Sequence, residues 1–217
     1  AEFDGLNLTW ETLEGVVKHN GPLIAAEGDS PPLPAAIAEY ASQHDLELAT
    51  HAGAEAQIAS LADDIAYNNH DIDDGLRAGL FGIDDLAEVP LVGGMFASVR
   101  ARYPGIENSR LIHESVRRLI GLMVDDLIAE TRRRVARLRP ASAADVRHAG
   151  DPIAAFSAAM QQNDRALKAF LRERMYRHYK LNRMTSKARR LVKDLFQLFV
   201  AEPECLPTEW RRRTDGA

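Results

Sequence analysis

Acidic side chains gather in one short stretch of this chain of 217 residues, LADDIAYNNHDIDD, at positions 61–74. At about 100° per residue of an α-helix, Asp63, Tyr67 and Asp71 stack one turn apart on one face. One carboxylate could bind a divalent metal ion, another could accept a hydrogen bond from a substrate hydroxyl, and the phenol could pack beside them. An acidic, solvated helix face with Tyr67 lying across a neighbour would show the same spacing. The spacing alone leaves both interpretations open.

The charge around this stretch is one-sided. Residues 1–76 hold one cation, Lys18, against fifteen acids, a net charge of −14, whereas residues 77–217 hold 26 cations and 17 acids, a net charge of +9. Like charges three or four residues apart destabilise a helix by roughly a few tenths of a kcal/mol per pair. A cation is therefore expected from elsewhere, either a bound metal ion or the basic part. Runs such as Arg132–Arg134 could hold phosphates, although a solvated helix face is the plainer interpretation.

Composition and short motifs exclude several classes of protein. Hydrophobic residues make up 46% and charged residues 27% of the chain, which is typical of a soluble globular protein and excludes wholesale disorder. A single cysteine, Cys205, excludes an intrachain disulfide framework and fits a reducing compartment, so we expect a cytoplasmic protein. No run of about 18 apolar residues predicts a membrane span. The HExxH, Walker-type, GxSxG and CxxC motifs are absent.

The chain has helical periodicity from end to end, and no stretch alternates apolar and polar residues over the length of a strand. Thr9 is expected to cap the first helix. The pattern predicts an all-α fold, in which residues 1–217 form one domain with an acidic part (1–80) and a basic part (81–217). Loops are expected near residues 22–34, 81–91, 104–107 and 139–153. The main helices are expected over residues 10–18, 35–43, 54–80, 108–138, 156–179 and 182–200.

The predicted helix over residues 54–80 has a second stripe, which is apolar. These side chains fall within about 60° of one another, on the side away from the acidic stripe. We expect this face to pack against the core while Asp63, Tyr67 and Asp71 line a cavity. The apolar stripe consists of Ile58, Leu61, Ile65, Ile72 and Leu76.

Three segments resemble the HD-domain deoxynucleoside triphosphate triphosphohydrolases, the dGTPase-like family. They are GLNLTWETLEGVVKHNGP (5–22), AQIASLADDIAYNNHDIDDGLRAGL (56–80) and RERMYRHYKLNRM (172–184), and the similarity runs through nearly the whole chain. The resemblance implies an HD-superfamily helical domain that holds a divalent ion such as Mg²⁺ or Mn²⁺. It also implies cleavage of a dNTP to deoxynucleoside and triphosphate, and a homo-oligomer.

The resemblance assigns roles to four residues. The metal-binding Asp of the family matches Asp63, and the substrate-facing Tyr and Asp on the same helix match Tyr67 and Asp71. A Tyr that lines the nucleotide pocket matches Tyr176.

Three cations are weaker candidates for phosphate contacts. Arg174 and Arg177 flank Tyr176, and they could instead be solvated or ion-paired. Lys18 lies near the end of its helix, where stabilising the helix dipole is an equally good explanation.

The sequence also departs from the family pattern. The first His, the His-Asp doublet and the His and Glu that assist water attack lie upstream of the GLNLT stretch in the family, and this chain starts after them. The dipeptides His44-Asp45 and His70-Asp71 stand outside the family's context for the doublet. We therefore expect the C-terminal portion of an active site, with one of four metal ligands, which could be inactive by itself.

Two other classes of function stay open. Another HD-superfamily phosphohydrolase, a nucleotidase or phosphodiesterase, would share Asp63 without needing Tyr67 and Asp71. A non-catalytic helical module could bind a partner or nucleic acid through the basic part. The acidic first part argues against a purely nucleic-acid-binding role, because phosphate binding favours net positive charge, so nucleic acid is considered only as a secondary ligand.

Overall fold

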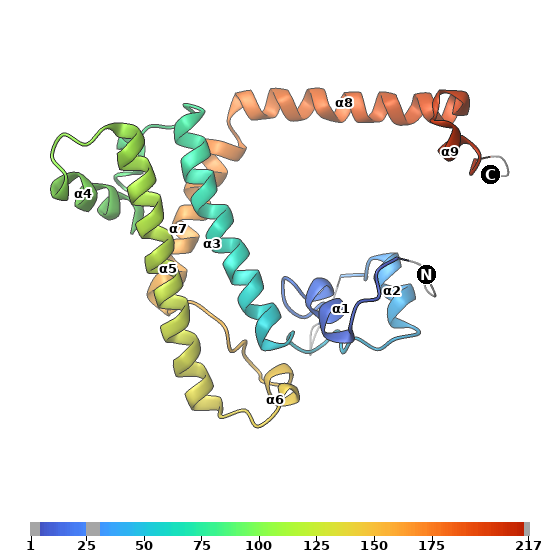
Figure 1. Cartoon of the computed structure of the whole chain (residues 1–217), viewed down its shortest axis with the longest axis horizontal. Coiled ribbons are helices and arrows are strands. Elements are labelled where there is room, and N and C mark those ends of the chain that lie inside the picture. Colours follow the sequence, from blue (N-terminus) through green and yellow to red (C-terminus); the bar gives the residue numbers. More distant parts are fainter. Residues whose placement is uncertain (1–4, 25–30, 215–217) are drawn as a thin grey trace.

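The computed structural model describes residues 5–24 and 31–214, and across these ranges every regular element is a helix (Figure 1). This confirms the all-α prediction. In chain order the elements are α1 (Trp10–Val17), α2 (Ala35–Ala41), α3 (Ala54–Arg77), η1 (Asp84–Leu86), α4 (Val92–Arg102), α5 (Asn108–Leu138), α6 (Ala143–Arg147), α7 (Ala158–Leu171), η2 (Arg172–Tyr176), α8 (Tyr179–Ala201), η3 (Pro203–Cys205) and α9 (Thr208–Arg211).

Local signals mark the ends of several helices. The hydroxyl of Thr9 accepts a hydrogen bond from the Thr12 amide, as expected of an N-cap. Helix α3 ends three residues before the predicted bound, ahead of Gly79, which has a φ of +62°. Helix α6 lies inside the loop predicted at 139–153, where Ser142 and Asp145 form a capping box. The Ser-x-x-Asp spacing at 142–145 is the local signal for this helix, so the prediction of a loop there is wrong.

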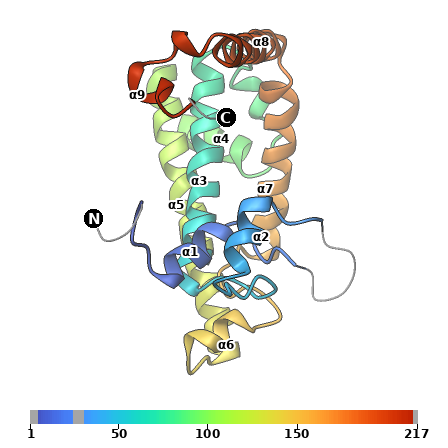
Figure 2. The ribbon, with the colours of Figure 1, turned by 90° about the vertical axis from the view of Figure 1, so that its right-hand side faces the viewer.

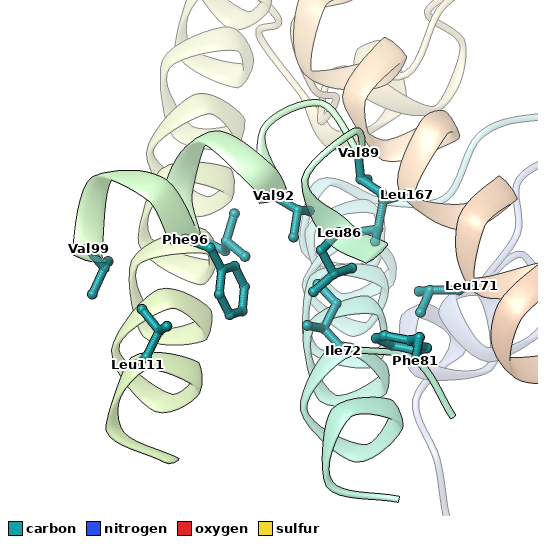
Figure 3. Close-up of a cluster of buried hydrophobic side chains, with 11 residues drawn as sticks. Ile72, Phe81, Leu86, Val89, Val92, Phe96, Val99, Leu111, Leu167 and Leu171 are labelled. Atoms are coloured by element: carbon teal, nitrogen blue, oxygen red, sulfur yellow. The ribbon is translucent and has the colours of Figure 1, made fainter. Parts of the chain in front are cut away.

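The core lies where α3, α4, α5 and α7 meet. Figure 2 shows α3 between α5 and α7, with α1 and α2 beside its lower half and α8 across its upper end. Burying each large aliphatic side chain contributes about 1.5–3 kcal/mol, so this cluster stabilises the arrangement of the four helices. Its buried members, drawn in Figure 3, are Ile72, Phe81, Leu86, Val89, Val92, Phe96, Val99, Leu111, Leu119, Leu167 and Leu171.

The apolar stripe of α3 packs as predicted except at its N-terminal end. Ile72 and Leu76 join the cluster of Figure 3, and Ile65 and Leu61 join a second cluster with Met123 and other residues of α5 and α7. Ile58 is 44% exposed, so the prediction that it faces the core is wrong. The first turns of α3 approach α1, where Gly15 faces Ala56, and lie outside both apolar clusters.

A buried ion cluster fixes α1. The Glu14 carboxylate is 1% exposed, and it accepts hydrogen bonds from the Lys18 ammonium at 3.0 Å and from Arg147 Nε at 2.9 and 3.0 Å. The Arg147 guanidinium also lies over the Trp10 ring, 4.7 Å from its centre. These contacts join α1 to α6, which is 133 residues away in the sequence.

No described helix combines the length and the apolar character that a membrane span needs. The most projecting element, α8, is amphipathic and carries many charges.

Two adjacent glycines of α4 give a matched pair of substitutions. We expect Gly93→Ala to lower the free energy of unfolding by about 1–3 kcal/mol, because a Cβ there would collide with the backbone carbonyl of Ala87. We expect Gly94→Ala, with open space around its Cβ, to be neutral or to stabilise by up to about 1 kcal/mol. Urea unfolding followed by circular dichroism measures both. Equal destabilisation by the two would contradict the close contact at Gly93.

Removing the buried charge of Glu14 should be costly. We expect Glu14→Gln to lower the free energy of unfolding by about 3–5 kcal/mol, because it leaves Lys18 and Arg147 without their carboxylate. Glu39→Gln, on the exposed surface of α2, should change it by less than about 0.5 kcal/mol. The same urea titration measures the free energy of unfolding of both variants. A Glu14→Gln protein as stable as wild type would show that the buried ion cluster does not contribute to stability.

Candidate active site

Helix α3 carries the acidic stripe from an open surface into the packed part of the protein. The Asp63 side chain is 69% exposed and Tyr67 is 58% exposed, whereas Asp71 is only 8% exposed. The residues stack as the helical spacing predicts, but Asp63 and Tyr67 lie on an open face of α3, so this part of the stripe does not line a cavity among the described residues. Asp71 is buried because η2 covers α3 at this level.

The structure brings Tyr176 to Asp71 across 105 residues of sequence, and the Tyr176 hydroxyl donates a hydrogen bond to the Asp71 carboxylate. Tyr176 ends η2, a turn of π-helix that follows α7 directly. Such a turn changes the direction in which side chains leave a helix, and π-turns are frequent at functional sites. Two residues that the family resemblance singles out are thus in direct contact.

The Asp71–Tyr176 pair has shifted acidities. Burial raises the pKa of Asp71, and the hydrogen bond from Tyr176 lowers it in part by stabilising the charged carboxylate. The pKa of Tyr176 is also raised, first by burial and then by its bonds to Asp71 and Tyr67. Tyr176 therefore stays protonated as a donor, and Asp71 keeps lone pairs with which to accept a further hydrogen bond.

Asp63 has one neighbour that could share a metal ion. The His19 Nε2 lies 3.5 Å from the Asp63 Oδ2, and both side chains are exposed. A divalent ion takes four to about eight ligands, so this pair would supply only part of a coordination shell. Across residues 5–24 and 31–214, no three His, Cys, Asp or Glu side chains are grouped to hold a metal ion. The donor types fit a metal, and the set is incomplete.

Lys18 is placed differently from the other candidates, because it is buried. Its ammonium donates to the Glu14 carboxylate at 3.0 Å, to the Thr50 hydroxyl at 2.8 Å and to the His51 carbonyl at 3.4 Å. These three acceptors satisfy its three N–H donors. A phosphate contact by Lys18 would require it to exchange some of these partners.

In addition to Arg77 of α3 itself, which pairs with Asp73, the acidic helix receives a cation from α7. The Lys168 ammonium lies 3.1 Å from the Asp64 carboxylate and 3.0 Å from that of Asp164. Asn68 of α3 also donates to Asp164, at 2.8 Å. Lys168, from the basic part of the chain, thus pairs with α3 at Asp64, as the charge asymmetry suggested.

Lys168 also lines a basic hollow on α7 and η2. Four cations surround this hollow, together with Ala169 and one acid, Glu173, and the hollow opens to solvent. Arg177 is one of the four, whereas Arg174 pairs with Asp85 at 3.0 Å, in a different direction. The other three cations were not predicted from the sequence, although their spacing of three and four residues is the helical signal for a shared face. The cations are Arg165, Lys168, Arg172 and Arg177.

Comparison with known proteins gives the arrangement a context. Residues 154–217, which run from the end of the α6–α7 connection through α9, match the model of the Phosphohydrolase-associated domain. The basic hollow, Tyr176 and α8 all lie within this matched segment.

Similarity to curated proteins extends over the whole chain. A protein of Parvibaculum lavamentivorans is 62% identical over 216 residues, which cover 100% of this chain and 54% of that protein. Proteins of Azorhizobium caulinodans and Caulobacter sp. are both 52% identical, over 97% and 99% of this chain and 54% of theirs. All three bear the name deoxyguanosinetriphosphate triphosphohydrolase-like protein, and the chain spans about half of their length. These matches confirm the family resemblance read in the sequence, and they make the chain homologous to about half of a dGTPase-like protein.

Proposed function

We propose that this protein takes part in the metal-dependent hydrolysis of dNTPs to deoxynucleoside and triphosphate. The observation that carries the proposal is the contact of Asp71 with Tyr176, which joins α3 to η2, together with a hollow on α7 and η2 that is lined by four cations. A hydrogen-bond acceptor for a sugar and cations for phosphates are the two features that a nucleoside triphosphate requires. The names of the relatives support the same reaction.

The sugar would be held by α3 and η2. Asp71 would accept a hydrogen bond from the 3′-hydroxyl, and Tyr176 would keep its carboxylate oriented and charged. Tyr67 would pack against the sugar where a 2′-hydroxyl would intrude, which would favour deoxyribonucleotides.

The phosphates would be held by the basic hollow. Lys168, Arg172 and Arg177 can each neutralise phosphoryl oxygens, and arginine can do so with two parallel hydrogen bonds. Lys168 is paired with Asp64 and Asp164 in this structure, so phosphate would compete with these carboxylates. Arg174 and Lys18 remain weaker candidates, because each already has partners within the protein.

Asp63 would hold the metal ion, with His19 as its nearest neighbour. A divalent ion supplies neutralisation of charge on the phosphoryl oxygens and lowers the pKa of a bound water. A working centre needs further ligands beyond these two. We expect a homo-oligomer as well, as the family resemblance implies.

Triphosphate release tests the proposal. We expect the intact enzyme, incubated with each dNTP and Mg²⁺ or Mn²⁺, to release triphosphate. Asp63→Ala should abolish turnover and weaken metal binding. Asp71→Ala should retain the metal but lose a hydrogen bond to a charged acceptor worth about 1.5–3 kcal/mol, so kcat/KM should fall roughly 10- to 150-fold.

Asp73→Asn is the matched control, because Asp73 lies on the same helix in a surface ion pair with Arg77. It should leave kcat/KM within a few-fold of wild type. Release of monophosphate or orthophosphate would instead indicate another hydrolase. Activity of the Asp63→Ala protein within a few-fold of wild type would refute the metal role of Asp63.

The Asp71–Tyr176 contact can be tested without catalysis. We expect Tyr176→Phe to raise the pKa of Asp71 further, because the variant loses the hydrogen bond that stabilises the carboxylate. Binding that requires an ionised Asp71 is lost as the pH falls through the Asp71 pKa. Because that pKa is higher in the variant, binding would be lost at a higher pH than in the wild type. The ¹³C shift of the Asp71 carboxyl, followed by NMR as a function of pH, measures this directly. Tyr179→Phe, on the exposed surface of α8, should leave the titration unchanged, and an unchanged titration in Tyr176→Phe would disprove the contact.

A further inference from the structure

Helix α8 presents a large apolar face to solvent. None of its 23 residues is buried, and Val192 and Phe196 are 67% and 68% exposed. Met184, Leu191 and Leu195 recur on the same side at helical spacing and are also exposed. Apolar faces of this size on a protein surface mark sites of interaction.

No other part of the chain that the structure describes covers this face. The main contacts of α8 are with η2 and η3, the segments that flank it in the sequence. Figure 1 shows α8 running away from the α3–α5–α7 layer with open space on its sides. The rest of its surface is strongly basic, since α8 contains six lysines and arginines and one acid, Asp194.

The complementary surface lies at the other end of α3. Residues 1–76 contain one cation, Lys18, which is buried and bound to Glu14, so this part offers no free lysine or arginine among its described residues. Its exposed acids include Glu39 and Glu55. Exposed apolar side chains accompany the acids: Leu6, Val16, Tyr40 and Ile58. Figure 1 places α1 and α2 at the end of α3 remote from α8, so the two surfaces do not meet within one chain.

We infer that α8 of one copy docks on the acidic N-terminal part of a second copy, here residues 5–24 and 31–60. Apolar side chains would pack at the centre of the contact, and the cations of α8 would face the carboxylates at its rim. A two-fold axis would generate two such contacts and close the dimer. This inference rests on the homo-oligomer expected in the proposed function and specifies which surfaces form its interface. Its test does not require catalytic activity.

The distribution of charge favours the acidic part of a second copy over other binding partners for α8. Packing α8 against α8 would bring six cations from each copy together. A flat anionic membrane would attract α8 but repel the acidic N-terminal part, whose residues 5–24 and 31–60 hold six acids and one cation, a net charge of −5. A nucleic acid backbone would use the cations and leave the apolar face of α8 uncovered.

Sedimentation velocity of the whole chain at micromolar concentration tests the inference. The wild type should sediment as a dimer or a larger assembly, and the double variant Val192→Asp/Phe196→Asp should sediment as a monomer. Both side chains are exposed, so circular dichroism should show an unchanged helix content. Leu122→Asp/Val124→Asp, on the exposed surface of α5, is the matched control and should leave the assembly intact.

A charge exchange identifies the partner surface. Lys187→Glu/Arg190→Glu reverses charge on α8, and Glu39→Lys/Glu55→Lys reverses it on the acidic part. Each variant alone should associate at least 10-fold more weakly than wild type at low salt. Mixing the two should restore association, because each α8 then meets a surface of opposite charge. High salt should weaken wild-type association.

Several results would overturn the inference. They are a monomeric wild type, α8 variants that assemble like wild type, mixed charge variants that fail to associate, or wild-type α8 binding to phosphatidylserine vesicles in place of self-association. Assembly that survives the α8 variants would place the interface elsewhere and leave the proposed hydrolase function untouched. Absence of triphosphate release alongside confirmed α8 docking would refute the proposed function alone.

Discussion

The buried carboxylate of Glu14 is the constraint on which the candidate site depends. A carboxylate removed from water is tolerated only with paired charges, and Lys18 and Arg147 provide them. Because Lys18 belongs to the end of α1 and Arg147 to α6, satisfying one charge fixes α1 against the rest of the protein. Helix α1 then lies against the first turns of α3, and His19 comes to lie beside Asp63.

Helix α3 carries this arrangement to the other half of the site. Its apolar face packs against α5 and α7, so the acidic stripe faces solvent at Asp63 and Tyr67. The π-turn η2 then covers the stripe at Asp71, where Tyr176 donates its hydrogen bond. The same helix thus presents an exposed carboxylate, for which we propose a metal ion, and a buried carboxylate, for which we propose a sugar hydroxyl. The two Asp residues differ in solvent exposure, since the Asp63 side chain is 69% exposed and Asp71 is 8% exposed.

The uneven distribution of charge affects both the candidate site and the exposed surfaces at the two ends of α3. The acidic helix takes a cation from α7, through Lys168, which pairs with Asp64. Among the described residues, the acidic N-terminal part and the basic helix α8 do not face each other, because they lie at opposite ends of α3. Part of the charge asymmetry in the sequence is therefore neutralised by the Lys168–Asp64 ion pair at the candidate site. The charges of the N-terminal part and of α8 are those that the proposed association between copies would pair.

The sequence by itself determined several of the main helices and the register of the stripe, because both follow from local periodicity: α5 begins and ends at the predicted residues 108 and 138, whereas the helix predicted over 156–179 ends at Leu171 and continues as the π-turn η2. It also contains the motifs that carry the family resemblance, and through them it pointed to Asp71 and Tyr176. Only the tertiary structure decided which residues meet and which are buried. The contact of Tyr176 with Asp71, the pairing of Lys168 with Asp64 and the exposure of Ile58 each depend on helices distant in the chain. Periodicity assigns a side chain to a face of its helix, but what covers that face is set by the packing of other helices.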